Sequence, residues 1–245
     1  MLAPKVHPAP EDLHPALWRA SQLAQATGRC VSTGHTVLSN QLVGKGWPTG
    51  ALIDLLIQQA GVKEIRLLAP ALRAVADRKI VMLQPPHSPQ IIGLAGLGIT
   101  PSTLLWIKSE SGPDALWAAE QILRSGSCGA LLFWAKHIRP ESLRRLHLAA
   151  QAGETLFFLL RPLAAAQDAC PAPLRLSLRA AAGGIEIMFV KRQGPQRDEP
   201  LFLPLPGPGT TAPRRVNNPQ PARVVRTPSL TTNAPELETA NLTAN

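Results

Sequence analysis

Between residues 51 and 161, short apolar stretches alternate with segments of helical periodicity, and this alternation constrains the fold more than any other feature of the chain. Near-continuous apolar runs are typical of strands that are buried on both faces of a parallel sheet. Helices between such strands form right-handed crossover connections. The sequence therefore predicts an α/β fold with a mainly parallel sheet flanked by helices. The expected strands are 51–57, 79–84, 103–108, 129–134 and 155–161, and the expected helices are 62–77, 89–97, 113–125 and 140–152.

The pattern changes after the last of these strands. Residues 173–181 and 185–192 alternate polar and apolar side chains on either side of Gly183 and Gly184, which predicts a hairpin. A final strand is expected over 200–205. The parallel core is therefore expected to be extended by antiparallel C-terminal strands.

Both ends of the chain differ in composition from the middle. Residues 11–26 predict an N-terminal helix, because acidic residues open the segment and apolar ones recur on one face. From Gly207 onward Pro, Thr, Asn and Arg dominate, and such a segment buries too little apolar surface to offset its ordering entropy. We therefore expect an N-terminal extension (1–30), an α/β domain (31–206) and a disordered tail (207–245).

The chain is basic, with a formal net charge of +9, and much of the excess lies near the C-terminus. Residues 191–226 contain seven basic residues and two acidic ones, Asp198 and Glu199. Such a segment favours contact with nucleic acid or with an acidic partner surface, although it can equally keep a flexible tail soluble. A purely structural DNA-binding role is less favoured, because aromatic residues for base stacking are only 4% of the chain.

Three cysteines, Cys30, Cys128 and Cys170, are odd in number and far apart in the sequence. This spacing argues against a disulfide framework and a structural zinc site, and it suits a reducing compartment. Prolines and acidic residues interrupt any apolar signal core at the N-terminus, and no uncharged apolar run reaches the roughly 18 residues of a membrane span. We expect a soluble cytoplasmic protein. We expect His87 to be an ordinary loop residue and Cys128 a small core residue, and neither to be catalytic.

The segment before the first strong strand resembles the start of the RecA core, where glycines permit positive φ angles and tight backbone approach. Its matching features are the turn Ser32-Thr33-Gly34, the leucines Leu38 and Leu42, and a GxGxPxG loop formed by Gly44, Gly46, Pro48 and Gly50. The resemblance continues in register to about residue 162. Its further positions are His87, Leu97, Gly98, Leu104, Leu105, Ala115, Leu116 and Leu123–Gly126.

The nucleotide-binding loop is where the sequence departs from RecA. A P-loop, GxxxxGK[ST], cradles phosphates with backbone N–H groups and supplies a lysine and a Mg²⁺-binding hydroxyl. If Gly61 is the second glycine, Val62 occupies the lysine position; if Lys63 is the lysine, Val62 replaces glycine and Glu64 replaces Ser/Thr. Neither register has the first glycine, near Leu56, or the hydroxyl.

Two further positions agree with this departure. The catalytic glutamate of RecA should precede His87, where this chain has Pro86. The Walker B acid should fall at Trp134, and residues 129–138 contain no Asp or Glu. Because phosphoryl transfer depends on metal and electrostatic positioning, we expect no ATP hydrolysis, no cofactor and no bound metal.

Four long stretches are similar to ImuA, the accessory family of translesion DNA synthesis, in its beta-proteobacterial form; this family is itself similar to the cell-division inhibitor SulA. The stretches are Asp114–Gly129, Glu141–Gln151, Thr155–Gln167 and Phe189–Asp198. The resemblance implies a non-enzymatic protein induced by DNA damage. It implies three partners: ImuB, which is an inactive Y-family polymerase relative, an error-prone C-family polymerase and, for some members, RecA. The alternative is a SulA-like inhibitor that binds FtsZ.

The expected mechanism is mimicry, because RecA protomers associate through an N-terminal helix and strand that dock on a neighbour's core. A RecA-like chain without ATPase chemistry can dock in this way but cannot go through a cycle of ATP binding and hydrolysis. Expected partner contacts are Leu13, Leu17 and Trp18 at one end and Lys191, Arg192 and Arg197 at the other. Expected nucleic-acid contacts are Arg214, Arg215, Arg223 and Arg226.

Overall fold

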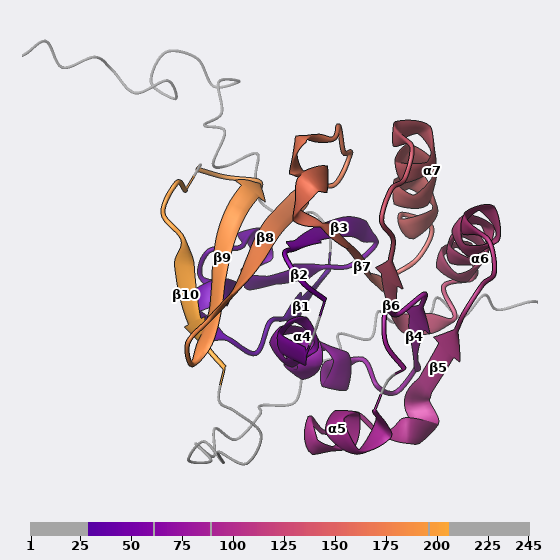
Figure 1. Cartoon of the computed structure of the whole chain (residues 1–245), viewed down its shortest axis with the longest axis horizontal. Coiled ribbons are helices and arrows are strands. Elements are labelled where there is room, and N and C mark those ends of the chain that lie inside the picture. Colours follow the sequence, from indigo (N-terminus) through magenta and orange to yellow (C-terminus); the bar gives the residue numbers. More distant parts are fainter. Residues whose placement is uncertain (1–28, 61, 89, 196, 206–245) are drawn as a thin grey trace, which may run out of the picture. The chain divides into compact units, whose positions relative to one another are not determined.

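An eight-stranded sheet forms the centre of the fold, with strand order β10-β9-β8-β3-β7-β6-β4-β5 (Figure 1). The computed structural model describes residues 29–60, 62–88, 90–195 and 197–205. The strands from β8 to β5 run parallel, and β9 and β10 continue the sheet in antiparallel pairing. The predicted α/β class, with its parallel core and antiparallel extension, is confirmed. The strands are β3 (Ala51–Ile57), β4 (Lys79–Leu83), β5 (Leu104–Ile107), β6 (Cys128–Trp134), β7 (Leu156–Pro162), β8 (Leu174–Ala181), β9 (Gly184–Lys191) and β10 (Leu201–Pro204).

Four helices connect the parallel strands: α4 (Val62–Ala74), α5 (Ile91–Gly96), α6 (Gly112–Ser125) and α7 (Pro140–Ala150). The hydroxyl of Ser111 caps α6 by accepting from the Asp114 N–H, and Gly126 ends the helix with a φ of 60°. Helix α4 ends before the predicted residue 77. Its continuation is a series of tighter turns, in which the N–H of Val75 bonds to the carbonyl of Leu72.

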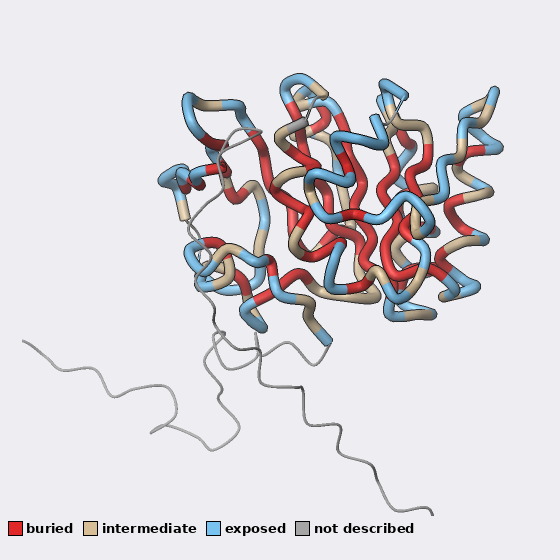
Figure 2. Tube along the Cα trace, turned by 90° about the horizontal axis from the view of Figure 1, so that it is seen from below, coloured by how far each residue is buried: buried red, intermediate tan, exposed pale blue. Residues whose placement is uncertain are grey.

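Two apolar cores cover the two faces of the sheet. Figure 2 shows buried positions concentrated in the interior of the domain. Leu67 and Leu68 of α4 pack on one face, and Ala119 of α6 and Leu143 of α7 pack on the other. Successive side chains of a strand point to opposite faces. Within β6, Leu131 accordingly belongs to the second core and Leu132 to the first, as expected for a strand buried on both sides.

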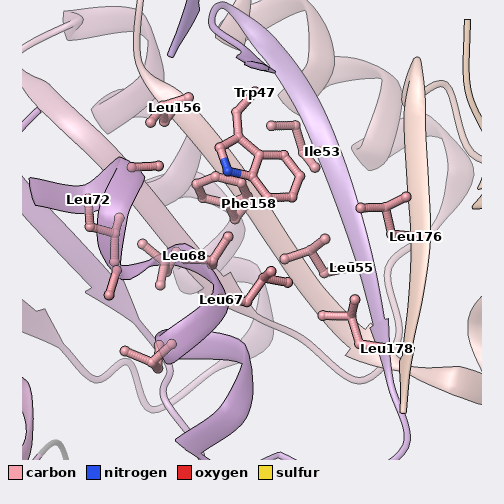
Figure 3. Packing of buried hydrophobic residues seen from close by; sticks show 14 of the residues in the cluster. Trp47, Ile53, Leu55, Leu67, Leu68, Leu72, Leu156, Phe158, Leu176 and Leu178 are labelled. Carbon is pink, nitrogen blue, oxygen red and sulfur yellow. The ribbon is translucent and has the colours of Figure 1, made fainter. Parts of the chain in front are cut away.

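A small two-stranded sheet, which the sequence patterns did not reveal, precedes β3. It pairs β1 (Cys30–Ser32) with β2 (Gly46–Pro48), and α3 (Thr36–Ser39) and the short 3-10 helix η1 (Val43–Lys45) lie between them. Trp47 of β2 is fully buried and meets Phe158 edge to face, with ring centroids 5.4 Å apart (Figure 3). Gly34 has a φ of +75°, and a Cβ there would lie 2.1 Å from Pro70 Cβ. The RecA-like glycines and leucines thus seat this small sheet on the first core.

Strand β5 departs from the expectation that all the apolar strands are buried on both faces. Leu105 is 47% exposed and Trp106 is 48% exposed. The reason is position, because β5 is the last strand of the sheet and, within the described residues, pairs only with β4.

Several sequence predictions lie outside the described residues. They are the helix at 11–26 with Leu13, Leu17 and Trp18, and the tail from 207 with Arg214, Arg215, Arg223 and Arg226. None of the helices in the described ranges is long and apolar enough to span a bilayer.

Candidate functional site

The connection between β3 and α4, where a P-loop would lie, is short. Only residues 58–61 separate Ile57 from Val62, and Gly61 itself lies outside the described residues. Lys63, in the first turn of α4, directs its ammonium group to the turn between β8 and β9. Its Nζ donates to the carbonyls of Ala181 at 2.6 Å and Gly184 at 3.0 Å. Leu56 and Glu64 are buried. The lysine of the degenerate loop therefore holds a hairpin.

This geometry predicts that Lys63→Ala lowers stability without removing an ATPase activity. Losing two charge-assisted hydrogen bonds at a half-buried site should lower the free energy of unfolding by about 1–2 kcal/mol. Urea denaturation measures this loss, and Lys108→Ala, which removes an exposed lysine, should change little. DNA-stimulated ATP turnover in the unmodified chain that disappears in Lys63→Ala would instead assign the lysine to nucleotide chemistry.

The two other positions that depart from RecA, Pro86 and Trp134, line a common cleft of about 660 Å³. It lies at the carboxyl ends of β3, β4, β6 and β7, where open α/β sheets generally bind ligands. Its walls are mainly apolar and include Ile57, Ala115, Leu116, Phe133, Ile138 and Leu160. The polar side chains around it are Gln58, Gln84, Lys136, His137 and Arg161. His87 is exposed in the loop after β4, and Cys128 is a core residue whose thiol pKa is raised by burial.

A buried ionic network lies beneath this cleft and was missed by sequence reasoning. Asp54, at the middle of β3, accepts from Arg161 Nε at 3.0 Å and Nη2 at 2.7 Å, and from Arg175 Nε at 2.9 Å. Asp54 and Arg161 are fully buried. Arg161 also reaches Asp168 at 3.3 Å, and Arg175 donates to the carbonyl of Ala165. Burial opposes the charge of Arg161, but its hydrogen bonds to Asp54 and the charge of Asp54 outweigh this and raise its pKa.

The basic residues at the end of β9 are largely engaged within the chain. Arg192 donates to the carbonyl of Gln41 at 2.8 Å and lies 4.9 Å from the ring centroid of Phe189. Arg197 donates to the carbonyl of Glu199 at 2.9 Å. Lys191 is exposed, and its Nζ lies 3.5 Å from the carbonyl of Cys170. Of the three expected partner contacts at this end, Lys191, Arg192 and Arg197, it is Arg192 whose side chain packs within the chain, against Gln41 and Phe189.

Five exposed apolar side chains come from β5, α5 and α6. Figure 1 shows these three elements at the β5 end of the sheet. Leu105 pairs in register with Val81 of one core and Trp106 with Met82 of the other, so the two side chains project to opposite faces of the edge strand. Scattered exposed hydrophobic residues are ordinary, but a concentration of them marks an interaction site. We call this set the β5 edge surface. Its members are Ile91 and Ile92 of α5, Leu105 and Trp106 of β5, and Trp117 of α6.

Among the described residues no strand lies beyond β5, and this open edge adds hydrogen-bonding groups to the apolar surface. An edge strand presents unpaired backbone N–H and C=O groups to which another chain can add a strand. The sequence predicted the strand at 103–108 but not its place at the edge, since strand order is not encoded in apolar periodicity. The run Leu104-Leu105-Trp106-Ile107 contains no charged residue. At the edge of a sheet, such an uncharged apolar strand indicates a surface that can pair with another chain.

Comparison with known proteins gives a partial similarity to a cell division inhibitor. No protein-family model matches the chain. Over 98 residues it is 31% identical to the cell division inhibitor SulA of Edwardsiella piscicida. The match covers 39% of this chain and 58% of that SulA, so the chain spans less than two thirds of the relative's length. The similarity relates the chain to SulA over part of its length.

Proposed function

We propose that this chain is a non-enzymatic accessory protein of the SOS response, acting by partner binding in mutagenic translesion DNA synthesis. Similarity to a SulA protein supports the link to the SOS response. The ImuA-like stretches between residues 114 and 198 support the finer assignment to translesion synthesis. The observation that carries partner binding is the β5 edge surface, where apolar side chains surround a strand edge.

The proposed mechanism uses the RecA-like shape without nucleotide turnover. An extended partner segment adds to β5 through main-chain hydrogen bonds, while Leu105 and Trp106 contact alternate side chains on the two faces. The proposed partners are an ImuB-like polymerase relative, an error-prone C-family polymerase and RecA. With Lys63 bonded to the β8–β9 turn and acids missing at Pro86 and Trp134, we propose no ATP-driven cycle. Direct DNA contact through Arg214, Arg215, Arg223 and Arg226 stays a prediction.

Genetics of the β5 edge surface tests this function. The double substitution Leu105→Lys and Trp106→Lys places charges on two half-exposed positions and should leave the fold intact. We expect cells that carry it to survive low ultraviolet doses almost normally but to lose most damage-induced mutation, as a deletion strain should. Leu148→Lys, at an exposed leucine on α7, is the matched control and should keep normal mutation frequencies. Unchanged induced mutagenesis in the deletion strain would refute the proposal.

Division inhibition is the second candidate function, and the SulA similarity favours it. Overproduction without DNA damage separates the two candidates. Filamentation within a few generations, combined with normal induced mutagenesis in the deletion strain, would assign the chain to FtsZ binding. Cells that keep dividing would support the accessory role in translesion synthesis.

A further inference from the structure

We propose that the cleft at the carboxyl ends of β3, β4, β6 and β7 binds a partner peptide through a bulky apolar side chain flanked by acidic residues. The proposal rests on the proposed role in partner binding but concerns a site separate from the strand edge. The cleft, at about 660 Å³, is within the range of ligand-binding pockets.

The walls of the cleft select an apolar occupant over a phosphate. Phe133, Ile138 and Leu160 are almost fully buried and present aromatic and aliphatic surface to the cleft. A phosphate requires a cradle of backbone N–H groups and a free cation. Lys63 is bound to the β8–β9 turn and Arg161 to Asp54, so neither is available to a phosphate, and the exposed Lys136 lies at the rim rather than in a backbone cradle.

Two features of the cleft are unfavourable in the free chain and indicate a ligand. Gln84 lies on the cleft with a φ of 55°, a left-handed conformation that is unfavourable for a side-chain-bearing residue before a proline. Trp134 Nε1 is buried and, among the described residues, has no hydrogen-bond partner. An unpaired buried donor is destabilising, and an acceptor on a ligand would satisfy it.

Charge at the rim favours an acidic peptide. Lys136, His137 and Arg139 are exposed in the loop between β6 and α7, and this loop contains no acidic residue. Among the residues that line the cleft, Lys136 is exposed and cationic and none is acidic. This lining attracts carboxylates toward the apolar cleft.

The proposed role in partner binding favours a protein segment over a free small molecule as the source of the apolar side chain. Leu116 of α6 lines the cleft, and Trp117, the next residue, is 64% exposed.

Titration with short labelled peptides tests the cleft without any cellular partner. The probe is a dansyl-labelled, end-blocked tetrapeptide Glu-Phe-Leu-Glu, compared with Lys-Phe-Leu-Lys and Glu-Ser-Ser-Glu, and binding is followed by fluorescence anisotropy. The acidic apolar peptide should bind most tightly. Lys136→Glu should weaken it about fivefold, whereas Arg144→Glu, the same charge change on the exposed face of α7, should have little effect.

A second variant tests the apolar cleft and its indole donor. Trp134→Phe keeps an aromatic ring and removes the N–H, and it should also weaken the acidic apolar peptide about fivefold. Circular dichroism checks that each variant is folded. Equal binding of the three peptides, or equal losses in Lys136→Glu and Arg144→Glu, would overturn the cleft proposal. Loss of induced mutagenesis on deletion would be unaffected by that result, so the two failures are distinguishable.

Discussion

Asp54→Ala is expected to destabilise the protein severely. The substitution leaves the guanidinium of Arg161, which is fully buried, and that of Arg175, which is 8% exposed, without their shared carboxylate. Removing one partner of a buried ion pair typically lowers stability by about 3–5 kcal/mol, and here two cations lose the same partner. Because whole domains are stable by only about 5–15 kcal/mol, the loss is a large part of the total. Urea denaturation followed by circular dichroism measures it.

Two further variants separate the ionic network from a general sensitivity to substitution. Asp77→Ala removes an exposed carboxylate and should change the free energy of unfolding by less than about 0.5 kcal/mol. The triple variant Asp54→Leu, Arg161→Met and Arg175→Met replaces the network with apolar side chains and should recover much of the lost stability. An Asp54→Ala protein as stable as the unmodified chain would contradict the geometry of the network.

Leu132→Asp is expected to have a comparable effect through the apolar core. Leu132 is fully buried in β6, in register with Met82 on one side and Phe158 on the other. A carboxylate there has no cationic partner among the described residues, and burying an unpaired charge is unfavourable by several kcal/mol. The variant should be insoluble or unfolded, and in cells it should behave as a deletion. Leu148→Asp, on the exposed side of α7, should fold, and a soluble, cooperatively unfolding Leu132→Asp protein would argue against the strand assignment.

The sequence was a good guide to the elements and a poor guide to their order. Apolar runs and flanking glycines placed each main strand within about two residues, because burial of both faces leaves a continuous signal. The same signal could not distinguish β5, whose exposed Leu105 and Trp106 follow from its place at the edge. The expected helices 113–125 and 140–152 agree within two residues with α6 and α7.

The buried network shows a second limit of sequence reasoning. Asp54 was visible as a carboxylate within an apolar strand, and Arg161 and Arg175 as cations in two others. Their pairing joins residues 107 and 121 positions apart and depends on β3 lying between β7 and β8. A carboxylate in a strand expected to be buried on both faces is the signal that could have pointed to a buried cationic partner, without identifying it.

The hydrogen bonds of Lys63 also bear on how this chain can change over generations. A lysine bound to the carbonyls of Ala181 and Gly184 cannot extend to a phosphate while it holds the turn. Substitutions that placed glycine before Lys63 and serine after it would restore the GK[ST] end of the P-loop pattern, but the lysine would still be bound to the turn and not to a phosphate. Releasing the cation would leave two carbonyls of the β8–β9 turn without their donor. A substitution that released this lysine would therefore lower stability before it brought any nucleotide chemistry.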